Sequence, residues 1–117
     1  MKNTRCQGWW EQGPHREEME GLMMQIEGGV VTGSGYDVVG MFTFEGSIDD
    51  AGNVSMIKTY MGKHAVGYQG MFDGNRRMSG LWKIHWMAGP WEILFRDEEG
   101  EQALEKQVEV EVLGNDA

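Results

Sequence analysis

Short segments of alternating apolar and polar residues, divided by turn residues about every ten positions, are the strongest constraint on how this chain can fold. Glycine, asparagine and aspartate tolerate the positive φ angles that tight β-turns require, so clusters of these residues indicate hairpins. The clusters are Gly28-Gly29, Asp49–Asn53, Gly62-Lys63, Asp73–Asn75 and Ala88–Pro90.

Between these turns the side chains alternate with the period of a β-strand. In residues 38–48 the even positions include Val38, Phe42 and Phe44, whereas the odd positions include Thr43 and Glu45. The pattern predicts strands near residues 6–12, 18–27, 30–35, 38–48, 53–61, 64–73, 77–87 and 90–96.

Sequential strands joined by short turns form an antiparallel, up-and-down meander. A meander of about eight strands removes its unpaired edges most simply by closing into a barrel. Four glycines on the face predicted to point inward, where a missing side chain allows strong bending, favour closure: Gly40, Gly46, Gly70 and Gly80. We therefore expect an all-β barrel with an acidic C-terminal extension.

The chain has 117 residues, which is enough for one domain. Residues 97–117 carry eight acids and one base, whereas residues 1–96 carry eleven acids and nine bases. We therefore divide the chain into a β-barrel over 1–96 and an acidic extension over 97–117. The alternating end of the extension predicts an extra strand over 107–113, a subunit-pairing strand, or a short helix over 101–108 that leads into a strand.

The net charge of −9 gives no general attraction to nucleic acid or to an anionic membrane, so we expect neither as a partner. The chain has one cysteine, no apolar run of about 18 residues and no apolar leader at its start. These features favour a soluble, cytoplasmic protein.

The first predicted strand contains Gly8-Trp9-Trp10, and the eighth ends at Arg96. This Gly-x-Trp arrangement, followed by a meander and an arginine, resembles the calycin superfamily of lipocalins, fatty-acid-binding proteins and avidin-like barrels. The resemblance implies a ligand-binding barrel in which Trp10 closes one end and Arg96 packs over it. The polar biotin ligands of avidin are not found in matching order.

Lys58 is the anomaly of the predicted interior. It shares its face with Tyr60, so its ammonium points inward and must find a carboxylate, reach solvent or lose its proton. The candidate carboxylates are Asp37 and Glu27. Tyr60, His64 and Tyr68 add hydrogen-bonding groups to an aromatic wall formed by Phe42, Phe44, Trp82 and Trp86.

A few polar groups in an apolar cavity are typical of a small-molecule site. We expect an amphiphilic or anionic hydrophobic ligand, with Lys58 at its head group and the aromatic residues at its body. The site would comprise Lys58, Tyr60, His64, Tyr68, Trp82, Phe42, Phe44 and Asp37.

Two other functions stay open. Side chains alone fill many eight-stranded barrels, and Lys58 paired with Asp37 could then be structural in a protein-interaction module. Alternatively, Tyr60, His64 and Tyr68 could serve as acid and base groups in a barrel isomerase or cyclase. No motif of an enzyme, metal site or cofactor site is evident, so we expect no cofactor, no metal and no catalytic residues.

Several apolar residues fall on the face predicted to point outward. A large exposed apolar patch on a small protein usually covers a partner, so a homodimer through the outer wall is expected. The residues are Val39, Met41, Ala65, Gly67, Met71, Leu81 and Met87.

Overall fold

The computed structural model describes residues 2–96, which form eight β-strands and no helix. The strands are β1 (Thr4–Gln12), β2 (His15–Glu27), β3 (Val30–Tyr36), β4 (Met41–Ile48), β5 (Asn53–Tyr60), β6 (Ala65–Phe72), β7 (Arg77–Ile84) and β8 (Met87–Phe95). The predicted strand over 107–113, like the rest of the extension, lies outside the described residues. Within residues 2–96 no helix is long and apolar enough to cross a membrane.

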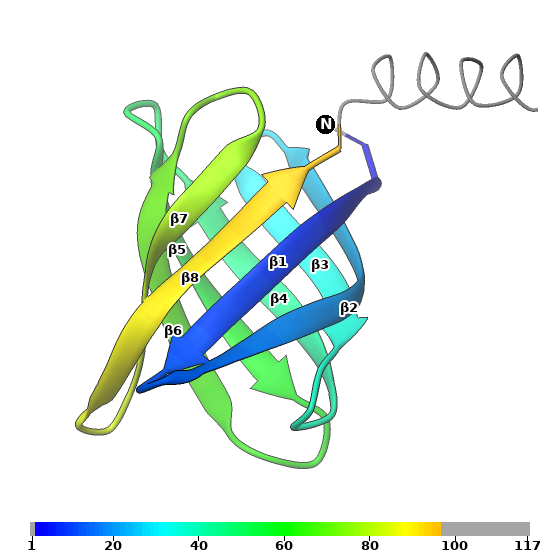
Figure 1. Ribbon diagram of the computed structural model, residues 1–117. Coiled ribbons are helices and arrows are strands. Elements are labelled where there is room, and N and C mark those ends of the chain that lie inside the picture. Colours follow the sequence, from blue (N-terminus) through cyan, green and yellow to red (C-terminus); the bar gives the residue numbers. More distant parts are fainter. Residues whose placement is uncertain (1, 97–117) are drawn as a thin grey trace, which may run out of the picture.

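Each strand pairs antiparallel with the next, and β1 pairs with β8, so the sheet closes on itself (Figure 1). The predicted fold class is confirmed. The β1–β2, β3–β4, β5–β6 and β7–β8 turns lie together at one end, which we call the mouth end (bottom of Figure 1). The other turns lie at the far end, where the backbone of Arg96 donates to the carbonyl of Arg5.

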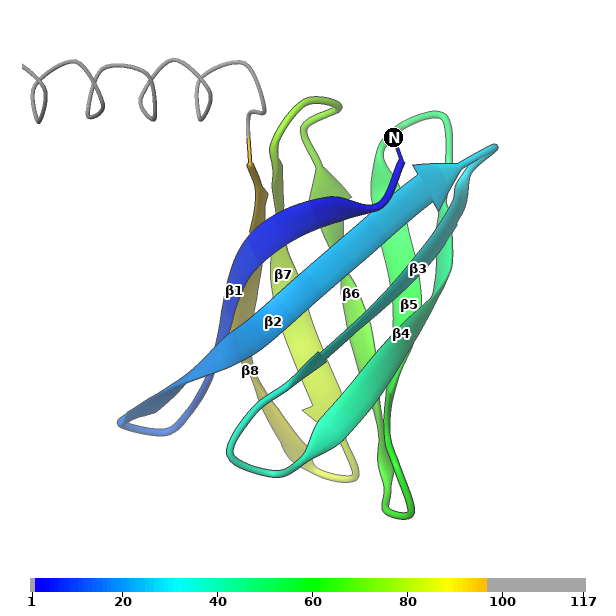
Figure 2. The same cartoon turned by 90° about the vertical axis from the view of Figure 1, so that its right-hand side faces the viewer.

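A β-bulge in β2 changes which side chains face the interior. The register with β1 shifts between the pairs Arg5–Met23 and Gly8–Met19, and Gly21 in between has φ of 57°. Met19 and Leu22 are both buried although they are three positions apart. An extra residue in a strand reverses its alternation, so the bulge keeps both halves of β2 apolar toward the core. Figure 2 shows the length of β2 between β1 and β3.

Close approach of β6 and β7 explains two of the four predicted inner glycines. Gly70 lies opposite Gly80, and a Cβ at either position would overlap the backbone of the other strand. The two strands therefore approach more closely than side chains would allow. Gly46 is packed in the same way against Met56, whereas Gly40 lies in the β3–β4 turn and not in a strand, so its predicted position was wrong.

The hairpin between β7 and β8 corrects the predicted strand over 77–87. β7 ends at Ile84, His85 adopts φ of 53°, and β8 begins at Met87. Trp86 is therefore at the tip of a turn with 87% of its surface exposed, and its predicted place in the inner wall was wrong. Alternation continued through Trp86 in the sequence because a two-residue turn preserves the period of two.

Large side chains pack tightly inside the barrel. Trp91, Phe42, Phe44 and Tyr68 are among the largest fully buried residues. Their rings meet edge to face or tilted, with centroids 5.4 Å apart for Phe42–Phe44 and 5.1 Å apart for Phe44–Tyr68. These rings belong to one continuous core of buried side chains.

Candidate functional site

Asp37 enters the barrel from the β3–β4 turn. The turn is held by hydrogen bonds in both directions between the backbones of Asp37 and Gly40. The Asp37 Oδ1 atom also accepts a hydrogen bond from the backbone of Val39, at 2.9 Å. This local geometry folds the carboxylate inward, and its side chain is fully buried.

The second carboxylate oxygen of Asp37 accepts three hydrogen bonds from two other strands. The donors are the Lys58 ammonium at 2.7 Å and the Tyr60 hydroxyl at 2.8 Å, both on β5, and the Trp10 indole at 3.1 Å, on β1. Lys58 and Tyr60 both point inward because they are two positions apart on one strand. A single carboxylate thus ties together β1, β5 and the β3–β4 turn.

Aromatic rings and one further oxygen surround the Lys58 ammonium. It donates to the Tyr68 hydroxyl at 3.3 Å and lies 4.2 Å from the centre of the Phe42 ring. The rings of Tyr60, Trp10, Tyr68 and Phe44 lie within 6 Å as well. Ring faces attract cations, so this cage offsets part of the cost of removing the ammonium from water. Among residues 2–96 no buried side-chain nitrogen or oxygen lacks a hydrogen-bond partner.

Burial and charge pairing both act on the pKa values of this cluster. Burial lowers the pKa of Lys58 from 10.5 to about 8, and the Asp37 carboxylate opposes that change. Burial by itself would raise the pKa of Asp37, but hydrogen bonds and charge from Lys58, then the Tyr60 bond, lower it below its ordinary value. Burial and then Asp37 raise the pKa of Tyr60 and of Tyr68, so both hydroxyls keep their protons at neutral pH.

A pocket of about 430 Å³ opens at the mouth end, and Trp10, Tyr60 and Tyr68 of this cluster form part of its lining. Most of its lining is aromatic or aliphatic, and none of its residues is an acid, lysine or arginine. The lining residues are Trp10, Gln12, Val39, Tyr60, His64, Val66, Tyr68, Trp82, Ile84, His85 and Met87.

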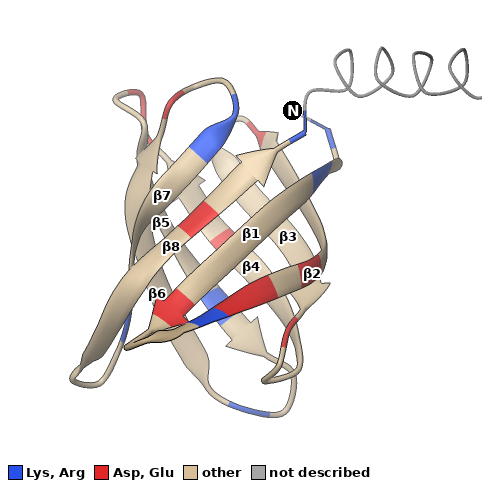
Figure 3. Ribbon diagram, viewed as in Figure 1, with Lys and Arg blue, Asp and Glu red and all other residues tan. Residues whose placement is uncertain are grey.

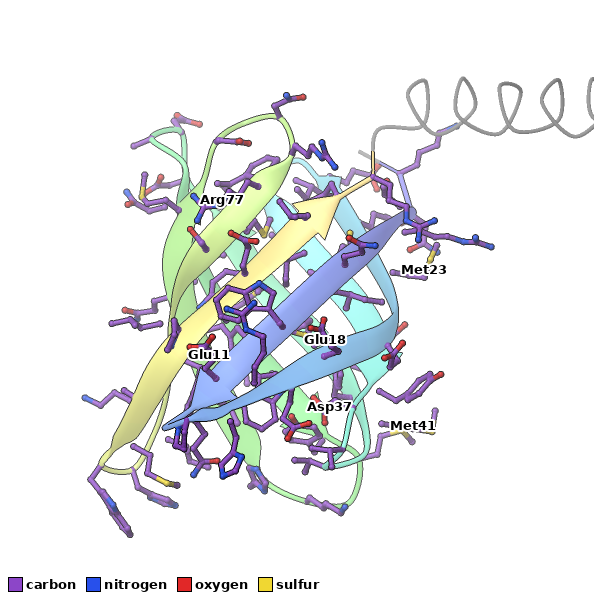
Figure 4. All side chains as sticks on the ribbon, viewed as in Figure 1. Glu11, Glu18, Met23, Asp37, Met41 and Arg77 are labelled. Atoms are coloured by element: carbon purple, nitrogen blue, oxygen red, sulfur yellow. The ribbon has the colours of Figure 1, made fainter. Side chains whose placement is uncertain are left out.

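The predicted site residues separate into three groups in the structure. Tyr60, His64, Tyr68 and Trp82 line the pocket. Lys58 and Asp37 lie behind the pocket wall as a buried pair, and Phe42 and Phe44 lie in the packed core with Lys58. Figure 4 shows Asp37 at the mouth end of the barrel.

The structure selects Asp37 and not Glu27 as the partner of Lys58. Glu27 is exposed beside the β2–β3 turn at the far end. His64 lines the pocket but is exposed to solvent. The centre of its ring lies 5.2 Å from the centre of the Tyr60 ring. No hydrogen bond joins His64 to a carboxylate within residues 2–96, so the arrangement gives no support to an acid–base pair.

Trp10 has a role that the sequence reasoning missed. The resemblance to calycins implied that Arg96 packs over it, but Arg96 lies beside Arg5, whereas Trp10 is opposite Trp91 toward the other end of β1. Trp10 instead bonds Asp37 and lines the pocket. The sequence did contain a signal for this role: Trp10 alternates with the inward-facing positions of β1, so its side chain points toward the interior.

A larger depression of about 690 Å³ lies on the outer wall beside the β-bulge. Its lining includes Arg5, Glu18, Glu20, Glu92 and Arg96, so charges of both signs surround it. The mouth pocket is smaller but apolar and set within the barrel, which is the usual character of a small-molecule site. Within residues 2–96 no three His, Cys, Asp or Glu side chains converge as a metal site would require.

Comparison with known proteins adds no family to this description. No protein-family model matches the chain, and neither curated proteins nor solved structures include a significant match. The fold and the site define the class of the protein as a small, closed, antiparallel β-barrel with an apolar pocket at one end.

Proposed function

We propose that the mouth pocket binds a small, mainly apolar and uncharged molecule. The observation that supports this most strongly is the pocket of about 430 Å³, which has an apolar and aromatic lining above a fully satisfied polar cluster. Ligand pockets in proteins commonly have volumes of ~300–1,000 Å³ and a lining of this kind.

Pairing within the barrel favours an uncharged ligand over the anionic one that the sequence suggested. The Lys58 charge is already balanced by Asp37 at 2.7 Å, and neither group belongs to the pocket lining. An anionic head group would lose its hydration at the pocket without gaining an unpaired cation. An uncharged ligand avoids that cost.

Tyr68 provides one point of polar recognition. The Tyr68 hydroxyl accepts a hydrogen bond from the Lys58 ammonium. Among residues 2–96 this is the hydrogen bond that the Tyr68 side chain makes. The hydroxyl's own proton is therefore available for a ligand oxygen, such as that of an ether, ester or ketone. Trp10 and Trp82 donate their indole protons to Asp37 and to the Glu11 carbonyl, so these rings offer mainly apolar surface.

Fluorescence titration with the neutral dye N-phenylnaphthylamine tests this function. We expect saturable binding at micromolar concentrations, and weaker binding of the anionic dye anilinonaphthalene sulfonate. Ile84→Trp places a bulky ring in the pocket lining and should abolish binding of the neutral dye. Ile57→Trp is the matched control, because Ile57 lies on the outer wall with half of its surface exposed.

Two results would contradict the proposal. One is the absence of saturable binding of any uncharged compound below millimolar concentration. The other is equal loss of binding in the Ile84→Trp and Ile57→Trp variants, which would place the dye outside the pocket. Either result would favour the filled barrel that acts through its outer surface.

A further inference from the structure

Two tyrosine hydroxyls of the mouth pocket each use only one of their two hydrogen-bonding functions. Tyr60 and Tyr68 line the pocket and are 3% and 2% exposed. A tyrosine hydroxyl has one proton to donate and an oxygen that accepts. Within residues 2–96 the Tyr60 hydroxyl makes one hydrogen bond, with Asp37, and the Tyr68 hydroxyl makes one, with Lys58. Each hydroxyl therefore keeps one unused function in a buried position.

The charges of the buried ion pair fix which function each hydroxyl uses. An ammonium has no lone pair, so Lys58 donates and the Tyr68 oxygen accepts, at 3.3 Å. An ionised carboxylate has no proton, so the Tyr60 hydroxyl donates and Asp37 accepts, at 2.8 Å. In Figure 3 the two charges are the basic position on β5 and the acidic position in the β3–β4 turn. The unused functions are consequently opposite: the proton of Tyr68 and an oxygen lone pair of Tyr60.

The same two charges strengthen the unused functions. Hydrogen bonds that share a group polarise one another. A hydroxyl that accepts from a cation becomes a better donor, and a hydroxyl that donates to an anion becomes a better acceptor. The side chains of Lys58 and Asp37 are 1% and 0% exposed, so solvent does not screen the effect. The ion pair therefore makes Tyr68 a strong donor and Tyr60 a strong acceptor.

The other polar residues of the pocket lining do not compete for a buried head group. Trp10 and Trp82 already donate their indole protons within the barrel. Gln12, His64 and His85 belong to the lining but are exposed to solvent. Polar recognition in the buried part of the pocket is left to the two tyrosines.

We infer that the mouth pocket selects a neutral, mainly apolar molecule whose head group both accepts and donates a hydrogen bond, as an alcohol does. Tyr68 donates to this head group and Tyr60 accepts from it. An ether or a ketone satisfies Tyr68 alone, and a hydrocarbon satisfies neither. Lys58 and Asp37 are positioning residues, because they act through the tyrosines and do not line the pocket. This inference rests on the proposed function, because it names the head group of the same ligand.

Three neutral naphthalenes, substituted at the same ring position, test the head group. Naphthylmethanol donates and accepts, its methyl ether only accepts, and ethylnaphthalene does neither. Calorimetric titration of the full chain measures the three Kd values. One hydrogen bond changes a Kd roughly two- to tenfold. We expect the alcohol to bind more tightly than the ether, and the ether more tightly than ethylnaphthalene, each by about that factor.

Phenylalanine substitutions assign the two roles, and ratios between the probes cancel their difference in size. Tyr68→Phe removes the donor, so the ether should lose its advantage over ethylnaphthalene. Tyr60→Phe removes the acceptor, so the alcohol should lose its advantage over the ether. Tyr36→Phe is the matched control, because Tyr36 is 53% exposed and does not line the pocket. It should leave both ratios unchanged.

The double variant Asp37→Asn/Lys58→Met tests the role of the ion pair. It keeps both tyrosines but removes the charges that fix the directions of their hydrogen bonds. The preference for the alcohol over the ether should shrink, while ethylnaphthalene binds as it does to the wild type. A purely structural role of the pair would instead weaken the binding of all three probes by the same factor.

The outcomes separate head-group selection from ligand binding. Equal binding of the three naphthalenes to the wild type would overturn the inference and leave the proposed function intact, and this comparison needs no variant. A preference for the alcohol that persists unchanged in Tyr60→Phe and Tyr68→Phe would also overturn it. Equal weakening of all probes in the double variant would refute the positioning role of the ion pair. If none of the three probes binds, the proposed function is wrong, and the inference falls with it.

Discussion

Replacing Asp37 by Asn removes the charge that balances Lys58 while keeping the size and shape of the side chain. The Lys58 side chain is 1% exposed and that of Asp37 is 0% exposed, so water cannot replace the lost charge. Breaking a buried ion pair on one side typically costs ~3–5 kcal/mol, because the remaining charge is left without a partner. We expect Asp37→Asn to lower the free energy of unfolding by about that amount.

Urea unfolding followed by tryptophan fluorescence measures this loss, and Asp49→Asn is the matched control. Asp49 also accepts hydrogen bonds within a turn, from Ala51 and Asn53, but it is exposed. Asparagine keeps an acceptor oxygen for the Ala51 and Asn53 amides, so this substitution should cost much less stability than Asp37→Asn. Equal costs for the two substitutions would refute the view that burial makes the Asp37–Lys58 pair essential.

A variant that lacks both charges separates the cost of an unpaired charge from the value of the ion pair itself. In the Asp37→Asn/Lys58→Met double variant no buried charge remains, so most of the lost stability should return. If Asp37→Asn alone does not fold, recovery of folding in the double variant gives the same answer.

The pH dependence of stability gives a further test of the Asp37 charge. The folded pKa of Asp37 is lowered, so its contribution is present above the unfolded pKa of about 3.9 and is lost as pH falls through the folded value. The stability difference between the wild type and Asp37→Asn should therefore narrow in acid.

Three further predictions concern Cys6, Gly70 and the pH dependence of the Lys58 contribution. Burial raises the pKa of the Cys6 thiol to about 12, so Cys6 should resist a disulfide reagent such as DTNB in the native protein and react readily in urea; fast reaction in the folded state would be inconsistent with its burial. Gly70→Ala should destabilise the fold by ~1–3 kcal/mol in urea melts, because its Cβ would overlap the β7 backbone, whereas Gly67→Ala on the same strand has ordinary contacts and should cost less than half as much. Between pH 8 and 10.5 the unfolded chain binds more protons at Lys58 than the folded chain does, so the wild type should gain stability relative to Lys58→Met as pH rises through this range, and a flat difference would show that the pKa is not lowered.

Strand number and barrel closure were predictable because turn residues and alternation are local properties of the sequence. Lys58 and Tyr60 on β5 illustrate this, since their spacing alone places both side chains inside once one face is apolar. The Asp37–Lys58 pair was one of two candidates, because an inward ammonium requires a nearby carboxylate. The homodimer expected through the outer wall stays a prediction, although two of its residues, Val39 and Met87, line the mouth pocket instead.

Features that depend on contacts between distant strands could not be predicted. The bulge at Gly21 reverses the alternation of β2, and nothing in the local sequence distinguishes it from an ordinary strand glycine. The depth to which Phe42, Phe44 and Trp91 fill the barrel depends on how side chains from several strands meet. For this reason the sequence did not show which inward side chains line the mouth pocket, or that Lys58 is absent from its lining.

The most direct test of the mouth pocket is a two-dimensional proton–nitrogen NMR spectrum of the five tryptophan indoles during titration with N-phenylnaphthylamine. Trp10 and Trp82 line the pocket, whereas Trp9 lies on the outer wall in the other depression. We expect the indole signals of Trp10 and Trp82 to shift saturably while that of Trp9 stays in place. Unchanged signals for Trp10 and Trp82, or a larger shift for Trp9, would contradict a ligand site at the mouth of the barrel.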